Sequence, residues 1–328
     1  MRGWRQQSGM HINQFNNTEA ITFNYRLCAV VFGTDETILN LPLNDGFFFV
    51  QRSLIPDIDH LDRIFDTNAM GLRRLYETAR INRETVNVIC IEKQIQIRLK
   101  PTDAAIYYNR QIDQDLASID NQIRAIRLVK ECPLRCKDFA IKIDSVQGAF
   151  DNMCFDSHIP IGESAATREL NRFHCDIQDI PDLKQKLDRI VFPIRNDTLN
   201  IMHRYYDLSY HCENYISITL LIAALEMIFL TRNDNKRQPL SKRCAVYMYD
   251  REDELVNCYN KLVAAYKQRS DFVHDGVFLG IDDETILFLR NCVRTALLRI
   301  DAATFEKNQF IAFQKEKVRN SILASLGN

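Results

Sequence analysis

The sequence predicts an α+β protein: a mixed N-terminal domain with antiparallel strands (residues 1–195), followed by an all-α helical bundle (residues 196–328). Two observations predict this division. Short runs rich in β-branched and aromatic residues, bounded by turn-forming residues, are concentrated in the first part. Beyond Asn196, every long segment carries apolar residues at the spacings of three and four that are typical of an amphipathic helix.

Five segments of the N-terminal part are predicted to contain strands. Residues 21–32 are rich in β-branched and aromatic side chains, and "ILNLPL" and "GFFFVQRS" follow as short strands separated by the turn signal "NDG". Residues 86–100 are expected to form a further pair of strands, and residues 139–144 another strand. We find no repeat and no chemical motif in this domain, so its role as a sensor or a targeting module stays open.

Helices are predicted wherever the apolar spacing changes to three and four. This pattern covers residues 102–130, and a short amphipathic helix is expected at residues 180–192 with Pro181 in its first turn. Beyond residue 196 the pattern predicts a bundle of about five helices. Its most apolar segment, residues 216–230, is shorter than the roughly 18–20 residues of a membrane span and contains Glu226, so we expect a buried core helix.

Composition limits the classes of function. The net charge is −1, which disfavours a protein whose main task is tight, non-specific nucleic-acid binding, but not an enzyme that acts on a short RNA stretch. The N-terminus has no apolar signal region, so we expect a cytoplasmic protein with no membrane partner. The ten scattered cysteines are expected to be reduced thiols. A zinc site at Cys132 and Cys136 with His174 and Cys175 is the weaker alternative, because adjacent ligands strain a tetrahedron; we expect no metal and no cofactor.

One stretch, "YKQRSDFVHDG", places Arg269, Ser270 and His274 near the end of a helical pattern. The spacing Arg269-Ser-Asp-Phe-Val-His274 resembles the R-x4-6-H signature of HEPN domains. The upstream "ALE" that ends at Glu226, a basic stretch before the next helix, and the pattern Y-x-x-RS-x-x-VH-x-G are similar to the ApeA-like branch of that family. The resemblance covers residues 205–326 and implies an HEPN-like helical fold.

The resemblance implies a metal-independent endoribonuclease that acts as a homodimer, often in antiviral defence or as a toxin. Such cleavage uses the RNA's own 2′-OH as nucleophile. Histidine transfers protons near neutral pH, and arginine offers a planar fork to phosphate oxygens. We therefore assign Arg269 and His274 as catalytic and Ser270 and Glu226 as supporting. The basic stretch is the candidate RNA-binding group, with Lys236, Arg237, Lys242 and Arg243.

Other interpretations of these residues remain open. His274 is also a normal helix C-terminal residue, and Arg269 a normal surface ion-pair partner. The two lie five positions apart, about 140° around a helix, whereas Ser270 and His274 share a face; a symmetric dimer would ease this separation. The alternative function is a non-catalytic HEPN-like module that binds nucleotide, RNA or a partner protein, and a structural assembly protein is a third. The RNA substrate and any trigger molecule or protein stay unspecified.

Overall fold

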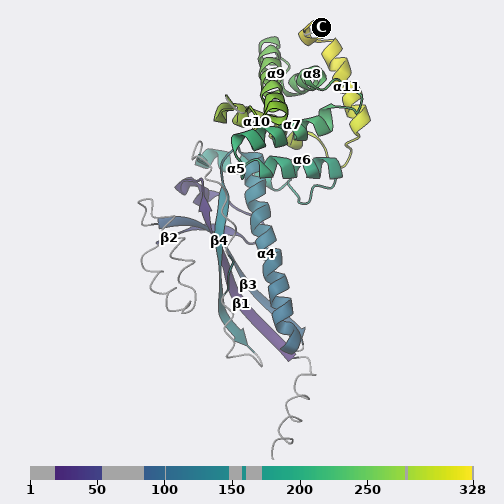
Figure 1. Cartoon of the computed structure of the whole chain (residues 1–328). Helices are drawn as coiled ribbons and strands as arrows, with labels where there is room; N and C mark the ends of the chain where they lie inside the picture. The colour runs from purple at the N-terminus through teal and green to yellow at the C-terminus, as the bar shows by residue number, and fades with distance from the viewer. Residues whose placement is uncertain are drawn as a thin grey trace, which may run out of the picture. The chain divides into compact units, whose positions relative to one another are not determined.

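The computed structural model describes residues 19–53, 85–99, 101–147, 157–159, 172–277 and 280–326. Contacts between residues divide the chain into two units, which are described separately below (Figure 1). The first unit holds the strands and most of one long helix, and the described residues of the second unit are Arg127–Glu131 and those from Arg189 onward. The predicted α+β class with a helical C-terminal part is confirmed.

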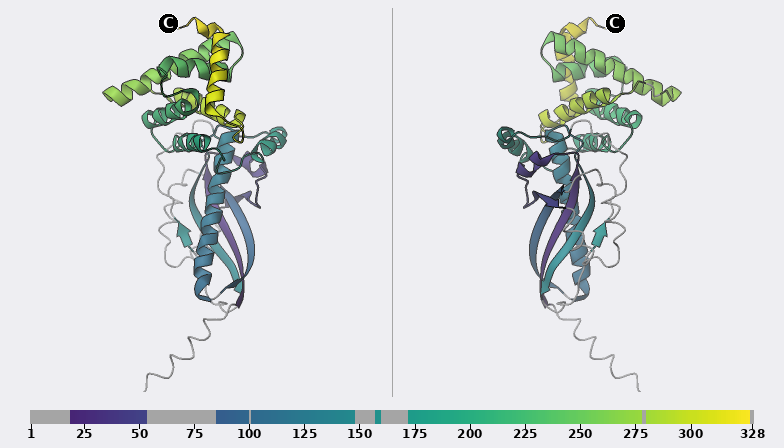
Figure 2. Two further views of the ribbon diagram at one scale, coloured as in Figure 1. Left: turned by 90° about the vertical axis from the view of Figure 1, so that its right-hand side faces the viewer. Right: turned by 90° about the vertical axis from the view of Figure 1, so that its left-hand side faces the viewer.

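The first unit is built on an antiparallel sheet in the order β2-β3-β1-β4-β5. The two long strands β1 and β3 pair along almost their whole length, and Cys28 on β1 lies opposite Cys90 on β3 and Ala140 on β4. Both views in Figure 2 show helix α4 lying along one face of this sheet. The bounds are β1 (Glu19–Phe32), β2 (Phe48–Ser53), β3 (Thr85–Leu99), β4 (Arg135–Gln147), β5 (Ser157–Ile159) and α4 (Pro101–Val129).

The apolar stripe of α4 explains its position and confirms the predicted helix at residues 102–130. Ile112, Ile119 and Ile123 are buried at spacings of seven and four, which places them on the same side of the helix. A buried carboxylate on the same helix, Asp115, pairs with Lys93 of β3. The helix therefore packs on its sheet through an apolar stripe, to which the Lys93–Asp115 ion pair is added.

Two strand predictions in this unit are wrong. "ILNLPL" begins with a short 3-10 helix, η1 (Glu36–Asn40), because the Asp35 side chain accepts a hydrogen bond of 2.9 Å from the Thr37 amide and starts a turn. The described part of the predicted pair at residues 86–100 belongs to the single strand β3 (Thr85–Leu99), since β1 supplies an uninterrupted partner. The turn predicted at "NDG" is present, with φ of 59° at Asp45 and 79° at Gly46. The predicted helix at 180–192 is η2 (Ile177–Asp179) and α5 (Ile180–Leu187), which ends earlier.

The second unit is a helical bundle around α7, the apolar helix predicted to lie in a core. Leu221, Leu225 and Ile228 of α7 are fully buried, and α7 contacts each of the other long helices of this unit. The described part of the chain has six α-helices here, where about five were predicted. They are α6 (Asp197–Leu208), α7 (Asn214–Phe229), α8 (Arg237–Met248), α9 (Glu252–Asp275), α10 (Asp283–Arg299) and α11 (Lys307–Arg319), followed by η3 (Ile322–Ala324).

The apolar side chains of α7 pack in the core of the helical unit. Across the described residues, none of the helices combines the length and hydropathy that crossing a bilayer requires.

Candidate active site at the end of helix α9

Helix α9 carries the two residues predicted to be catalytic on its last two turns. Three acidic residues in its first turn suit the positive end of the helix dipole, and its buried positions end at Tyr266. No residue from 267 to 275 is fully buried. Gly276 then takes the left-handed conformation (φ 68°) and donates its amide to the Phe272 carbonyl at 3.0 Å, which closes the helix. The candidate residues therefore lie on an accessible helix end.

Arg269 is half-buried and rests on the residue three positions before it. Its guanidinium carbon lies 5.8 Å from the centroid of the Tyr266 ring, a cation–π contact. Its Nε is shielded from solvent and has no hydrogen-bond partner among the described residues. Among the described residues, no carboxylate oxygen lies within 4.0 Å of a guanidinium nitrogen of Arg269, so Arg269 forms no ion pair there. The guanidinium is thus held by an aromatic ring rather than neutralised by an acid.

His274 is exposed on the last turn, one turn beyond the half-buried Ser270. Two valines beside it are unusually open for apolar side chains, with Val273 46% and Val277 48% exposed. Phe272 turns the other way and packs on Tyr215 of α7, with ring centroids 5.1 Å apart. The structure therefore brings Arg269, Ser270 and His274 to one helix end, while the five-residue spacing leaves Arg269 and His274 on different faces.

Glu226 of α7 contacts this helix end through Tyr266, which the sequence did not single out as a site residue. The Tyr266 hydroxyl donates a hydrogen bond of 2.9 Å to the Glu226 carboxylate. Burial, reinforced by the carboxylate, raises the pKa of Tyr266 to about 12, so the phenol stays protonated at neutral pH. The position of Tyr266, one helical turn before Arg269, is the signal that could have identified it.

The predicted RNA-binding group is only partly on the surface. Lys236 and Arg237 are exposed and Lys242 is half-buried. Arg243 is 5% exposed and forms two hydrogen bonds with Asp234 and one with the Phe229 carbonyl, so its guanidinium is used inside the fold and its assignment to RNA is not retained.

The exposed part of this basic group lies some distance from the candidate pair. Near the start of α8, the Gln238 side chain accepts a hydrogen bond of 2.6 Å from Tyr259. Tyr259 precedes Arg269 by ten positions, or about 15 Å along α9 at the usual helical rise. The basic group is therefore separate from the last turns of α9, and lies beside the same helix.

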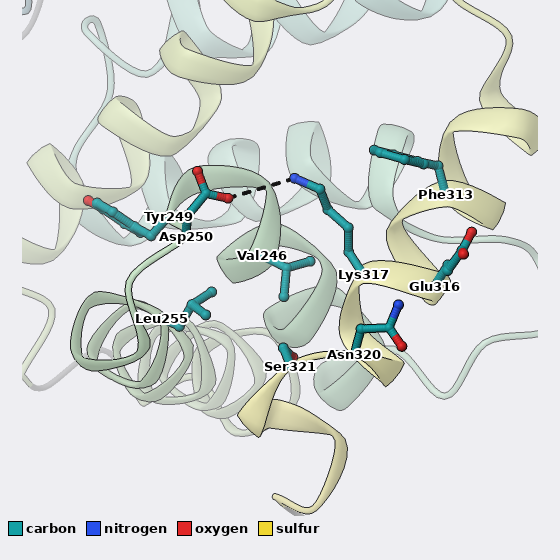
Figure 3. Close-up of a pocket in the computed structure, with 9 residues that line it drawn as sticks. All are labelled: Val246, Tyr249, Asp250, Leu255, Phe313, Glu316, Lys317, Asn320 and Ser321. Carbon is teal, nitrogen blue, oxygen red and sulfur yellow. Dashed lines mark ion pairs between the residues drawn. The ribbon is translucent and has the colours of Figure 1, made fainter.

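A pocket of about 290 Å³ lies near the other end of α9 (Figure 3). Its lining comes from the end of α8, the start of α9 and helix α11, and contains none of the predicted site residues. Lys317 points toward Asp250 across it, with 3.9 Å between the ammonium and the carboxylate. The pocket is therefore distinct from the candidate active site.

The alternative zinc ligands are engaged elsewhere. His174 Nδ1 lies 2.7 Å from the Asp35 carboxylate, which raises the pKa of the imidazole. Cys132 and Cys175 are buried thiols. Within the residues that the structure describes, no three His, Cys, Asp or Glu side chains gather as metal ligands would.

No family model, curated protein or solved structure matches this chain.

Proposed function

We propose that the protein is an endoribonuclease that cleaves RNA by attack of the 2′-OH on the adjacent phosphate, with Arg269 and His274 as the catalytic pair. The observation that carries this proposal is the state of Arg269, a guanidinium at an accessible helix end with no acidic partner among the described residues. An arginine of this kind is suited to bind a phosphate.

The proposed chemistry needs two functions, and the pair supplies both. His274 is exposed and transfers a proton to or from the 2′-OH or the leaving 5′-oxygen. Arg269 stabilises the negative charge that develops on the phosphoryl oxygens. Ser270, which shares a face with His274, supports the site by hydrogen bonding. The reaction uses no metal in this proposal, because the RNA itself provides the nucleophile.

The separation of Arg269 and His274 around the helix supports a dimeric enzyme. In a symmetric dimer, two copies of the α9 end would line one cleft, and Arg269 of one protomer would face a phosphate beside His274 of its partner. The exposed Val273 and Val277 lie at the same end and are suited to be covered by a second copy. Lys236, Arg237 and Lys242 extend the proposed contact with RNA along α9.

The proposed setting is regulated cleavage in antiviral defence or as a toxin, in which the first unit responds to a trigger molecule or protein. The resemblance to HEPN domains supports this setting. It also supplies the alternative, a non-catalytic module that binds RNA or nucleotide.

The test compares purified wild-type protein with Arg269→Ala and His274→Ala on labelled RNA in the presence of EDTA. Cleavage by the wild type alone, with 2′,3′-cyclic phosphate ends, supports the proposal. Equal RNA binding by all three proteins without cleavage supports the non-catalytic module. Expression of the same three chains in cells, with growth as the readout, reveals an activity that needs a cellular trigger.

A further inference from the structure

Two oppositely charged side chains contact the same tyrosine at the candidate site. Glu226 of α7 accepts a hydrogen bond from the Tyr266 hydroxyl at 2.9 Å, and the Arg269 guanidinium carbon lies 5.8 Å from the centroid of the same ring. Yet no ion pair joins Glu226 to Arg269 within 4.0 Å. A carboxylate and a guanidinium that share a neighbour but do not pair require an explanation.

We propose that Tyr266, by holding the Glu226 carboxylate in a hydrogen bond, keeps it from pairing with Arg269 and so leaves the guanidinium available to an RNA phosphate. Tyr266 is thus a positioning residue that acts through Arg269. This inference rests on the proposed nuclease function and names a residue which that function needs.

The Glu226 carboxylate needs a hydrogen-bond donor. Glu226 is half-buried in a helix whose neighbouring positions are almost all apolar, so part of its side chain is removed from water. A carboxylate in such surroundings is costly unless it accepts a strong hydrogen bond. Tyr266 supplies that bond as a neutral donor, and a neutral donor leaves the charge of Arg269 uncompensated.

Removal of the Tyr266 hydroxyl would leave Glu226 to pair with another donor. With phenylalanine at position 266, Glu226 loses this donor, and Arg269 is the cation that lies against the same ring. The long arginine side chain can move to form a charge-assisted pair with the carboxylate. That pair would compete with phosphate for the same guanidinium, and RNA binding and cleavage would both weaken.

The decisive measurement is a rescue by charge removal. Tyr266→Phe is expected to lower cleavage about tenfold, the size of one charge-assisted hydrogen bond, and to reduce the salt dependence of RNA binding by about 0.7 in log–log slope, the value of one lost phosphate contact on a single strand. In this proposal Glu226 only competes for Arg269 and has no supporting part in catalysis, which differs from its assignment from the sequence. The double variant Tyr266→Phe with Glu226→Gln therefore has no carboxylate that competes for Arg269. Cleavage and salt slope should then return toward wild-type values.

Tyr259 provides a matched control on the same helix. It is 6% exposed, compared with 8% for Tyr266, and its hydroxyl donates to the neutral side chain of Gln238. Tyr259→Phe removes a buried hydrogen bond of similar kind, so it should lower thermal stability about as much as Tyr266→Phe does. It should leave cleavage and the salt slope unchanged.

Each outcome decides the inference. Loss in Tyr266→Phe, recovery in the double variant and no loss in Tyr259→Phe support it. Normal cleavage by Tyr266→Phe overturns it while the nuclease function stands. A loss that the double variant does not repair assigns Tyr266 to packing and also overturns it. If the wild type fails to cleave RNA both in vitro and in cells, the proposed function fails and this inference falls with it.

Discussion

Arg243 forms a two-pronged ion pair with Asp234, with hydrogen bonds of 2.7 and 2.8 Å between the guanidinium nitrogens and the two carboxylate oxygens. Both side chains are largely buried, at 7% and 13% exposure. Thr231 adds two hydrogen bonds to one carboxylate oxygen, and the Phe229 carbonyl accepts a third bond from Arg243. The cluster fixes the loop between α7 and α8.

We expect Asp234→Asn to destabilise the protein by about 3 kcal/mol, because it leaves the Arg243 charge buried and uncompensated. Urea unfolding followed by circular dichroism measures the change. Asp253→Asn is the control, since its pair with Arg251 is exposed and should contribute less than about 1 kcal/mol. Equal losses in both variants would contradict the structural role of the Arg243 pair.

The same cluster predicts a pH dependence of stability. The hydrogen bonds from Arg243 and Thr231 hold the pKa of Asp234 well below its usual range. A carboxyl whose pKa is lowered by folding contributes stability above its unfolded pKa of about 4, and that contribution is lost as the pH falls below this value. The free energy of unfolding of the wild type should therefore drop between about pH 5 and pH 2. The drop should be smaller in Asp234→Asn.

Glu131 predicts a pH dependence of the opposite sign. It accepts hydrogen bonds from Tyr210 at 2.6 Å and Tyr206 at 3.2 Å, and Arg290 lies 3.8 Å away. Burial nevertheless raises the pKa of Glu131, because loss of hydration outweighs the nearby charge. The folded state therefore binds this proton more tightly than the unfolded state. The contribution of Glu131 to stability falls as the pH rises from about 4.5 through the raised pKa.

Replacing Glu131 separates its charge from its hydrogen bonds. Glu131→Gln keeps an oxygen acceptor for the two phenols and removes the titration, so its stability relative to the wild type should increase with pH. Glu131→Ala should cost about 3 kcal/mol near pH 4, because Arg290 and two phenols lose their contact with Glu131, and the cost should shrink as the pH rises, because the variant has no buried carboxyl to ionise. Thermal unfolding at several pH values from 4 to 8 measures both. A relative stability of Glu131→Gln that does not change with pH would contradict the raised pKa.

The periodic features of this fold could be predicted from the sequence. The spacing of Ile112, Ile119 and Ile123 predicted α4, and the apolar run around Leu221 predicted the core helix α7, because burial acts on every turn of a helix and leaves a regular pattern. Gly276 ends α9 in the left-handed conformation, which favours glycine, so the glycine in "VHDG" is itself a sequence signal for this helix terminus.

Features that depend on one side chain or a distant partner could not be predicted in this way. The Asp35 carboxylate turns the following residues into η1, and pairing with β1 keeps β3 in one piece. Glu131 packs with the helical unit although it precedes the predicted boundary by many residues. It does so through hydrogen bonds with Tyr206 and Tyr210, which leave no periodic pattern in the sequence. The chemistry proposed for Arg269 and His274 stays a prediction.

The assignment of Arg243 to the RNA-binding group could have been avoided from the sequence itself. Arg243 lies in a basic run, which favours an exposed position. It also lies three positions after the buried Leu240 and three positions before the buried Val246, so helical spacing places it on the inner face. Periodicity was the better guide there than charge.

Gly276 should matter more to the candidate site than to stability. Its φ is 68°, and among the described residues no atom beyond its own helix and chain neighbours lies within 4 Å of where a Cβ would stand, so Gly276→Ala costs only the left-handed conformation, about 1 kcal/mol. We expect the last turn to fray and RNA cleavage to fall several-fold, because His274 loses its fixed position. Gly276→Asn should retain more activity, since asparagine tolerates this conformation.

Gly46 offers a matched control for that variant. It has φ of 79° and equally open surroundings, but it lies in a turn of the first unit. Gly46→Ala should lower thermal stability by a similar amount, and it should cleave RNA as fast as the wild type. If both alanine variants lower cleavage equally, the α9 terminus has no special part in the activity.

The exposed valines beside His274 predict a self-association surface. Val273 and Val277 are each nearly half exposed at the helix end that carries the proposed catalytic pair. A charge placed among apolar side chains that a second copy covers would be desolvated without a partner. Val273→Asp should therefore convert a dimer into a monomer and abolish cleavage, as measured by sedimentation and by RNA digestion of the same samples. Leu208 on α6 is 47% exposed and lies on another helix, so Leu208→Asp should leave both properties unchanged.

Mixing two inactive proteins tests whether protomers share the cleft. If Arg269 of one copy acts with His274 of the other, a heterodimer of Arg269→Ala and His274→Ala chains contains one cleft half with both functional residues, and it should recover part of the wild-type cleavage. The same mixture made with Val273→Asp in both chains should stay inactive. Full cleavage by a monomeric Val273→Asp protein would show instead that a single helix end brings the guanidinium and the imidazole to one phosphate. In that case the last turns of α9 must rearrange when RNA binds, because five helical positions alone keep the two side chains on different faces.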